Sequence, residues 1–190
     1  MPKTLIDVNG NIDRFLTEAA ECAAKELGFA ALLTTFPVIL SVSETIYKQN
    51  NPNRQHDKIC DKILFENFIP TLIDKTWLVT RSPAITLSDQ DIINDMLQIR
   101  NALTHQLSLT HNVGMVNSRT YAQSFFDDHP LIEHIICVQE FVEAVKVTIA
   151  MHITNYPDAI FDKYPKKADP RAPANRISGI SSSGSAVPDK

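Results

Sequence analysis

An apolar stripe at helical spacing near the end of the chain constrains its fold more than any other feature. Its main members are Val138, Val142, Val145, Ile149 and Ile153. Because they recur every three or four residues, they share one face of an α-helix. Ile132, Ile136 and Phe141 widen the stripe. We therefore expect one long, centrally buried helix that enters near Pro130 and ends at about Thr154.

Four earlier segments have the composition and spacing of helices, namely residues 12–27, 29–48, 57–68 and 88–107. In the first, Phe15, Ala19, Ala23 and Leu27 would share one face. Gly28 either ends or loosens that helix, and Pro37 predicts a kink or break in the next. Ser88 is the expected N-cap of the fourth, with Asp91 in a capping-box arrangement.

The remaining segments add little regular structure to this prediction. Residues 49–55 form a polar loop, residues 72–79 add a short helical piece, and residues 109–128 are either an irregular loop or a small hairpin. The sequence thus predicts an all-α, up-and-down bundle of about five helices. We expect this domain to span residues 1–163. We expect residues 164–190, rich in Pro, Ser and Gly, to form a disordered tail.

Charge, cysteine content and hydropathy exclude several classes of protein. The net charge of −4 lacks the basic field of a general nucleic-acid binder. Three scattered cysteines indicate neither a disulfide framework nor a zinc knuckle. We find no export signal, and the longest apolar run, residues 29–40, is too short to cross a bilayer. These features predict a cytoplasmic protein with no membrane partner. We expect no metal and no cofactor, because the chain has no GxxxxGK(S/T), GxGxxG or HExxH motif and its histidines do not pair at i, i+4.

The short motif at Arg100, Asn101 and His105 is the most specific chemical signal in the chain. Its RNxxxH spacing has a chance expectation of about 0.014 copies, given seven Arg, twelve Asn and six His in 190 residues. On an α-helix, Ile92, Met96, Ile99, Leu103 and Leu107 would face the core. Asn101 and His105 would then point outward one turn apart, with Arg100 on the flank.

The outward face of the same helix carries a polar stripe without fixed charge. Its members are Gln90, Asn94, Gln98, Asn101 and His105, and Thr104 lies beside them. An ordinary solvated face usually carries Lys and Glu, whereas amides suit a surface that becomes covered and must stay hydrogen-bonded. We interpret the stripe as a dimer interface or substrate groove. An ordinary exposed face that happens to lack charges is the alternative.

These residue types fit RNA cleavage by the 2′-OH without a metal. His105 can take or give a proton near neutral pH, and Arg100 can stabilise charge on phosphate oxygens. Asn101 can orient the imidazole or hydrogen-bond the substrate. The motif and the helical pattern resemble the HEPN superfamily.

The resemblance implies a metal-independent endoribonuclease with a composite Arg/His site across a homodimer cleft. It also implies a toxin–antitoxin, antiviral or stress-defence setting, with an antitoxin or regulatory protein as a further partner. Two features depart from that pattern. Some family members carry a nucleotidylated Tyr two residues after the motif His, but Leu107 stands there in this chain. The segment 88–111 also has one Arg against Asp89, Asp91 and Asp95.

Two other functions stay open on the sequence alone. The chain could be a non-catalytic module of the same descent that dimerises or binds a partner through the amide stripe. It could also be an unrelated ligand-binding or scaffold bundle in which RNxxxH is accidental.

Overall fold

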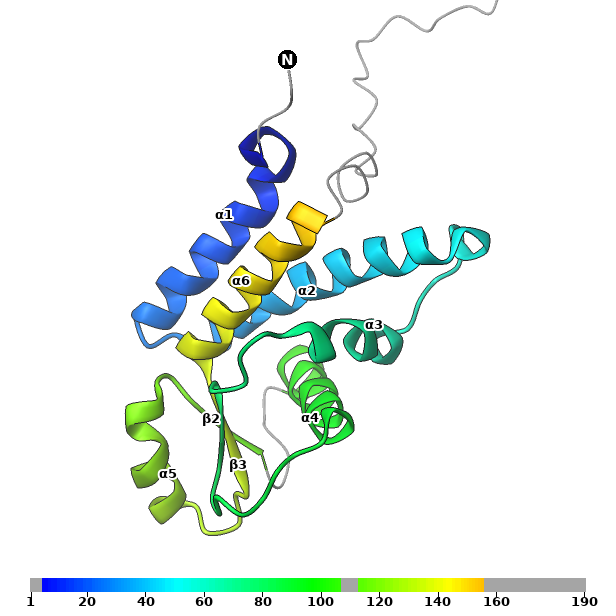
Figure 1. The fold of residues 1–190 in the computed structure, drawn as a ribbon. Helices are drawn as coiled ribbons and strands as arrows, with labels where there is room; N and C mark the ends of the chain where they lie inside the picture. The colour runs from blue at the N-terminus through cyan, green and yellow to red at the C-terminus, as the bar shows by residue number, and fades with distance from the viewer. Residues whose placement is uncertain (1–4, 107–112, 156–190) are drawn as a thin grey trace, which may run out of the picture.

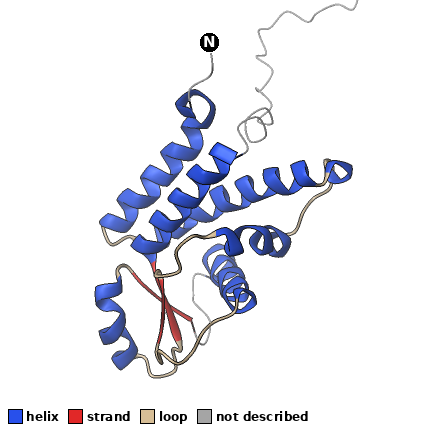
Figure 2. Cartoon of the chain, viewed as in Figure 1, coloured by secondary structure: helices blue, strands red, loops and turns tan. Residues whose placement is uncertain are grey.

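The computed structural model describes residues 5–106 and 113–155, which are mostly helical (Figures 1 and 2). The helices are α1 (Leu5–Ala24), α2 (Gly28–Asn50), α3 (Asp61–Phe68), α4 (Asp89–Asn101), α5 (Ala122–Asp128) and α6 (Val138–Asn155). Three 3₁₀ turns lie at Pro52–Arg54, Ile69–Thr71 and Arg119–Tyr121, and a π-helical turn at Ala102–Gln106. The predicted helical bundle is confirmed, with a small sheet added to it.

The buried stripe of α6 forms part of the main core, as its spacing predicts. Val138, Val142, Val145, Ile149 and Ile153 are all buried. Both α1 and α2 pack against α6, and α2 also packs against α3. Figure 1 shows these long helices together in the upper half of the molecule. The expected domain, residues 1–163, extends beyond the described residues. The expected tail, residues 164–190, lies wholly outside them.

A three-stranded sheet was not predicted. It consists of β1 (Leu78–Thr80), β2 (Val113–Val116) and β3 (His134–Cys137), in the order β1-β3-β2. The central strand β3 is antiparallel to β1 and parallel to β2. In Figure 1 the strands lie between α5 and α4.

The sheet corrects three predictions at once. The helical piece expected at residues 72–79 is wrong, because Leu78 and Val79 belong to β1. The last helix begins at Val138 instead of near Pro130, because the four residues before it form β3. All four are buried, and a short continuous apolar run does not distinguish a buried strand from a buried helix. Between 113 and 128, β2 and α5 replace the expected loop or hairpin.

The buried face of α1 is rotated slightly about the helix axis from the face that the sequence predicted. Ala19 and Ala23 are buried, but Phe15 is 47% and Leu27 53% exposed. Ile12 and Leu16 are the apolar residues that complete the buried face. The helix ends at Ala24, so Leu27 lies in the turn before α2 and no longer follows the helical period.

Helix α2 continues through Pro37 without a break. Pro37 lies on the exposed side of the helix, where water can satisfy the carbonyl that the missing N–H leaves free. By length and composition α2 could also cross a membrane, with a mean hydropathy of 1.6 in its most apolar window. A core helix passes the same test, and 44% of that window is buried. The absence of a membrane partner therefore stays a prediction.

Candidate functional site

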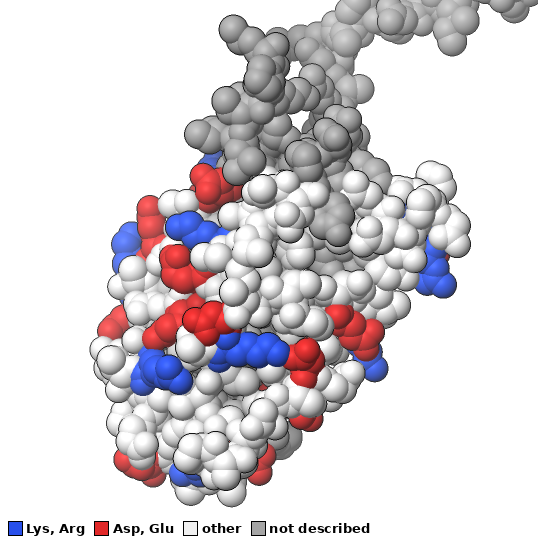
Figure 3. Space-filling view, viewed as in Figure 1, with Lys and Arg blue, Asp and Glu red and all other residues white. Residues whose placement is uncertain are grey.

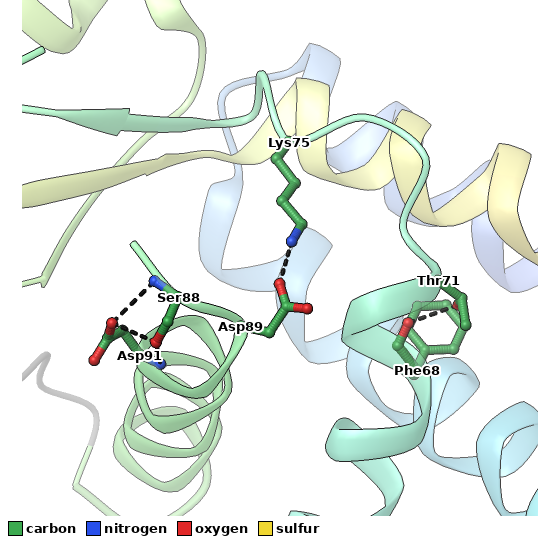
Figure 4. A network of polar contacts seen from close by, with 6 residues as sticks. All are labelled: Phe68, Thr71, Lys75, Ser88, Asp89 and Asp91. Carbon is green, nitrogen blue, oxygen red and sulfur yellow. Dashed lines mark hydrogen bonds and ion pairs between the residues drawn. The ribbon is translucent and has the colours of Figure 1, made fainter. Parts of the chain in front are cut away.

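The start of α4 is fixed by the predicted capping box (Figure 4). The Ser88 hydroxyl oxygen accepts a hydrogen bond from the Asp91 backbone N–H at 3.2 Å, and the Asp91 carboxylate accepts one from the Ser88 backbone N–H at 3.0 Å. Hydrogen bonds from the Ser88 side chain and backbone lower the pKa of the Asp91 carboxyl. Lys75 forms an ion pair with Asp89 beside the cap. These contacts set where the helix begins.

The inner face of α4 packs into the core as predicted. Ile92, Met96, Ile99 and Leu103 are buried, and Leu107 lies outside the described residues. Because these four side chains are held in the core, the opposite face of the helix, with Gln90, Asn94 and Asn101, is turned toward solvent.

One acidic residue of α4 is buried, which the sequence pattern did not reveal. Asp95 is 5% exposed and lies beside His134, the first residue of β3, which is also 5% exposed. The distance from Asp95 Oδ2 to His134 Nε2 is 2.6 Å, and no well-directed hydrogen bond reaches either atom within the described structure. Each group is therefore the polar partner that offsets the free-energy cost of burying the other. The pair connects the motif helix to the central strand.

The outer face of α4 is exposed along its whole length. Gln90, Asn94, Gln98, Asn101 and Thr104 are all exposed residues. The Gln90 amide donates a hydrogen bond to the Asn94 amide oxygen at 3.2 Å. An uncharged, hydrogen-bonding surface thus leads along the helix toward the motif. Its use as an interface or substrate groove stays a prediction.

Arg100 is held by two polar neighbours, of which the sequence indicated only one. Its Nη1 group donates to the Asn101 amide oxygen at 3.1 Å. Its Nη2 group lies 2.8 Å from Asp61 Oδ2 on α3. Asp61 was missed because its partner lies 39 positions away in sequence, and no local pattern marks so distant an ion pair. The motif arginine is therefore neutralised by a carboxylate in this structure.

The second half of the motif departs from the α-helix that was predicted. Helix α4 ends at Asn101, and Ala102–Gln106 form a π-helical turn. A π turn contains more residues than an α turn, so the Asn101-to-His105 spacing no longer corresponds to one α turn. The Thr104 hydroxyl donates to the Arg100 carbonyl at 2.9 Å. Single π turns within helices frequently occur at functional sites.

His105 lies in this π turn, but its side chain is outside what the structure describes. The structure therefore brings Arg100 and Asn101 together and leaves the outward direction of His105 a prediction. The position of the His105 side chain relative to Arg100 also stays a prediction.

The three acidic residues that outnumber Arg100 in the segment 88–111 lie away from its guanidinium in the structure. Asp91 lies nine residues before Arg100, about 13 Å along the helix, which exceeds the Debye length of about 8 Å at physiological salt. Asp89 is still farther away, and Asp95 is paired with His134. Figure 3 shows acidic and basic side chains close to one another over part of the face it draws, with broad uncharged areas beside them. The carboxylate that matters for Arg100 is Asp61.

The described residues hold no group of three or more His, Cys, Asp or Glu side chains that could bind a metal ion. No protein-family model, curated protein or solved structure matches this chain.

Breaking the buried Asp95–His134 pair should strongly destabilise the protein. We expect Asp95→Ala to lower the free energy of unfolding by about 1–3 kcal/mol, because it leaves the buried His134 ring without the polar partner that compensates its burial. Asp89→Ala is the matched control, since its ion pair with Lys75 is partly exposed and should contribute about 1 kcal/mol or less. Urea denaturation measures both values. Equal, small losses would contradict a stabilising role for the pair.

Proposed function

We propose that this chain is a HEPN-type, metal-independent endoribonuclease that acts as a homodimer. The RNxxxH motif carries the proposal, because its Arg100 and Asn101 lie together on the motif helix at the end of an exposed, uncharged surface. The π turn that contains His105 supports it as a local departure from regular helix. RNA is the proposed substrate, and an antitoxin or regulatory protein the proposed further partner.

In the proposed reaction, His105 accepts the proton of a ribose 2′-OH as that oxygen attacks the adjacent phosphorus. The bond from phosphorus to the 5′ oxygen of the next nucleotide breaks, and a protonated imidazole returns a proton to this leaving oxygen. The products are a 2′,3′-cyclic phosphate and a 5′-OH. Arg100 stabilises the charge that grows on the phosphate oxygens, and Asn101 holds the guanidinium or the substrate.

A homodimer would place two such sets of residues beside each other across a two-fold axis. The part of the polar stripe formed by Gln90, Asn94 and Gln98, with Thr104 beside it, is the proposed interface or RNA groove. Its side chains can exchange bonds with water for bonds with a partner without burying a fixed charge.

The alternative is a non-catalytic interaction module that uses the same stripe for self-association or for a partner. The ion pair between Arg100 and Asp61 favours this reading, because it already compensates the charge of the guanidinium and has to open before a phosphate can bind. The two functions share the dimer and differ in RNA turnover.

Cleavage of single-stranded and structured RNA in EDTA tests the proposed activity. We expect the wild-type protein to cleave, and His105→Ala and Arg100→Ala each to lose about 100-fold or more in rate, because each removes a group that acts in the transition state. His56→Ala and Arg14→Ala are matched controls at exposed positions elsewhere in the chain. Activity that persists in His105→Ala would contradict the mechanism, and no activity in wild type would favour the interaction module.

A charge placed on the amide stripe should weaken self-association. We expect Asn94→Lys to shift the protein from dimer to monomer, because two-fold symmetry would place the new charges in a shared, desolvated surface. Gln123→Lys, on the exposed side of α5, is the matched control. Sedimentation equilibrium measures the dissociation constants. A wild-type monomer, or equal dimerisation of both variants, would contradict the interface.

A further inference from the structure

The ion pair between Arg100 and Asp61 occupies the part of the guanidinium that a phosphate would need. Arg100 Nη2 lies 2.8 Å from Asp61 Oδ2, and the side chains are 28% and 32% exposed. Carboxylate and phosphate oxygens bind a guanidinium in the same planar geometry. The carboxylate therefore stands where a substrate phosphate oxygen would bind.

Asp61 is held in this place by its own helix. It is the first residue of α3, and it lies in the first turn, where the helix dipole favours a negative charge. Helix α3 in turn packs against α4, the helix that carries Arg100. The packing of α3 against α4 thus places the Asp61 carboxylate beside the Arg100 guanidinium.

We propose that Asp61 is a built-in competitor for RNA phosphate at Arg100. This inference rests on the proposed function, and it assigns to Asp61 the regulation of that site. A phosphodiester replaces the carboxylate on the guanidinium, while Asn101 keeps its bond to the other Nη group.

The competition between Asp61 and phosphate favours an RNA strand over a single phosphate group as the ligand of Arg100. A single phosphate that displaces Asp61 exchanges one anion for another and leaves Asp61 unpaired beside it. An RNA strand offers further contacts along its backbone that offset this cost. Water screens a partly exposed ion pair, so a strand can open the contact without unfolding α3.

Asp61→Asn is the most direct test, because it removes the charge and keeps the size of the side chain. The probe is a short, 2′-O-methylated oligouridylate, which cannot be cleaved by its own 2′ oxygen, and fluorescence anisotropy measures its dissociation constant. We expect Asp61→Asn to bind about two- to fivefold more tightly than wild type, which is the scale of a partly exposed ion pair. Its affinity should also depend more steeply on salt, by up to about 0.7 in the logarithmic slope.

Two comparisons make the result specific to Arg100. Asp57→Asn removes a carboxylate from an exposed residue that lies 3.9 Å from Arg54, and it should leave binding unchanged. In an Arg100→Ala background, Asp61→Asn should have no effect, because the group for which it competes is gone. Thermal unfolding checks that each variant is folded.

Unchanged or weaker binding by Asp61→Asn would overturn the proposal and make Asp61 a residue that positions Arg100. Equal tightening in the Arg100→Ala background would also overturn it, because the effect would then be one of general charge. If neither wild type nor Asp61→Asn binds the oligouridylate, the proposal is also overturned. Since the probe is not cleaved, loss of nuclease activity alone contradicts the proposed function and not the competition.

Discussion

Burial of one face of α4 is the constraint on which the arrangement of the candidate site depends. Ile92, Met96 and Ile99 are almost completely removed from solvent, so the helix cannot rotate without exposing them. The Ser88 cap fixes where the helix starts, and the buried Asp95–His134 pair fixes it against the central strand. With these contacts made, the amides of the opposite face are exposed and Arg100 is directed toward α3.

The partner that α3 supplies changes how the motif is understood. The sequence motif gives no sign of an acidic partner for Arg100. In the fold, the Asp61 carboxylate compensates the charge of its guanidinium. A composite nuclease site needs positive charge only when substrate is present, and a weak, partly exposed ion pair provides that condition. The same pair would be a plain structural contact in a module that never binds RNA. Under the proposed function, RNA binding depends on whether a phosphate can displace the Asp61 carboxylate from the Arg100 guanidinium.

The sequence predicted the parts of the fold that follow from local periodicity. The stripe of α6, the inner face of α4 and the Ser88 cap were all recognised, since each depends on spacing within one element. It did not predict β3, because a run of four buried residues has no distinguishing period. The contacts of Asp61 with Arg100 and of Asp95 with His134 join separate elements, so no local pattern could reveal them. The π turn was missed because it depends on how the end of α4 packs, which helical spacing does not encode.

The central claim is that Arg100 and His105 from two subunits form one site, and a mixing experiment tests it most directly. Arg100→Ala and His105→Ala proteins are each inactive on this account. If the two residues of a site come from different subunits, a mixed dimer contains one intact site and one that lacks both residues. Random mixing makes half of the dimers mixed, so RNA cleavage should recover to about a quarter of the wild-type rate. Recovery to that level is the predicted result, and a mixture as inactive as its separate components would contradict a shared site.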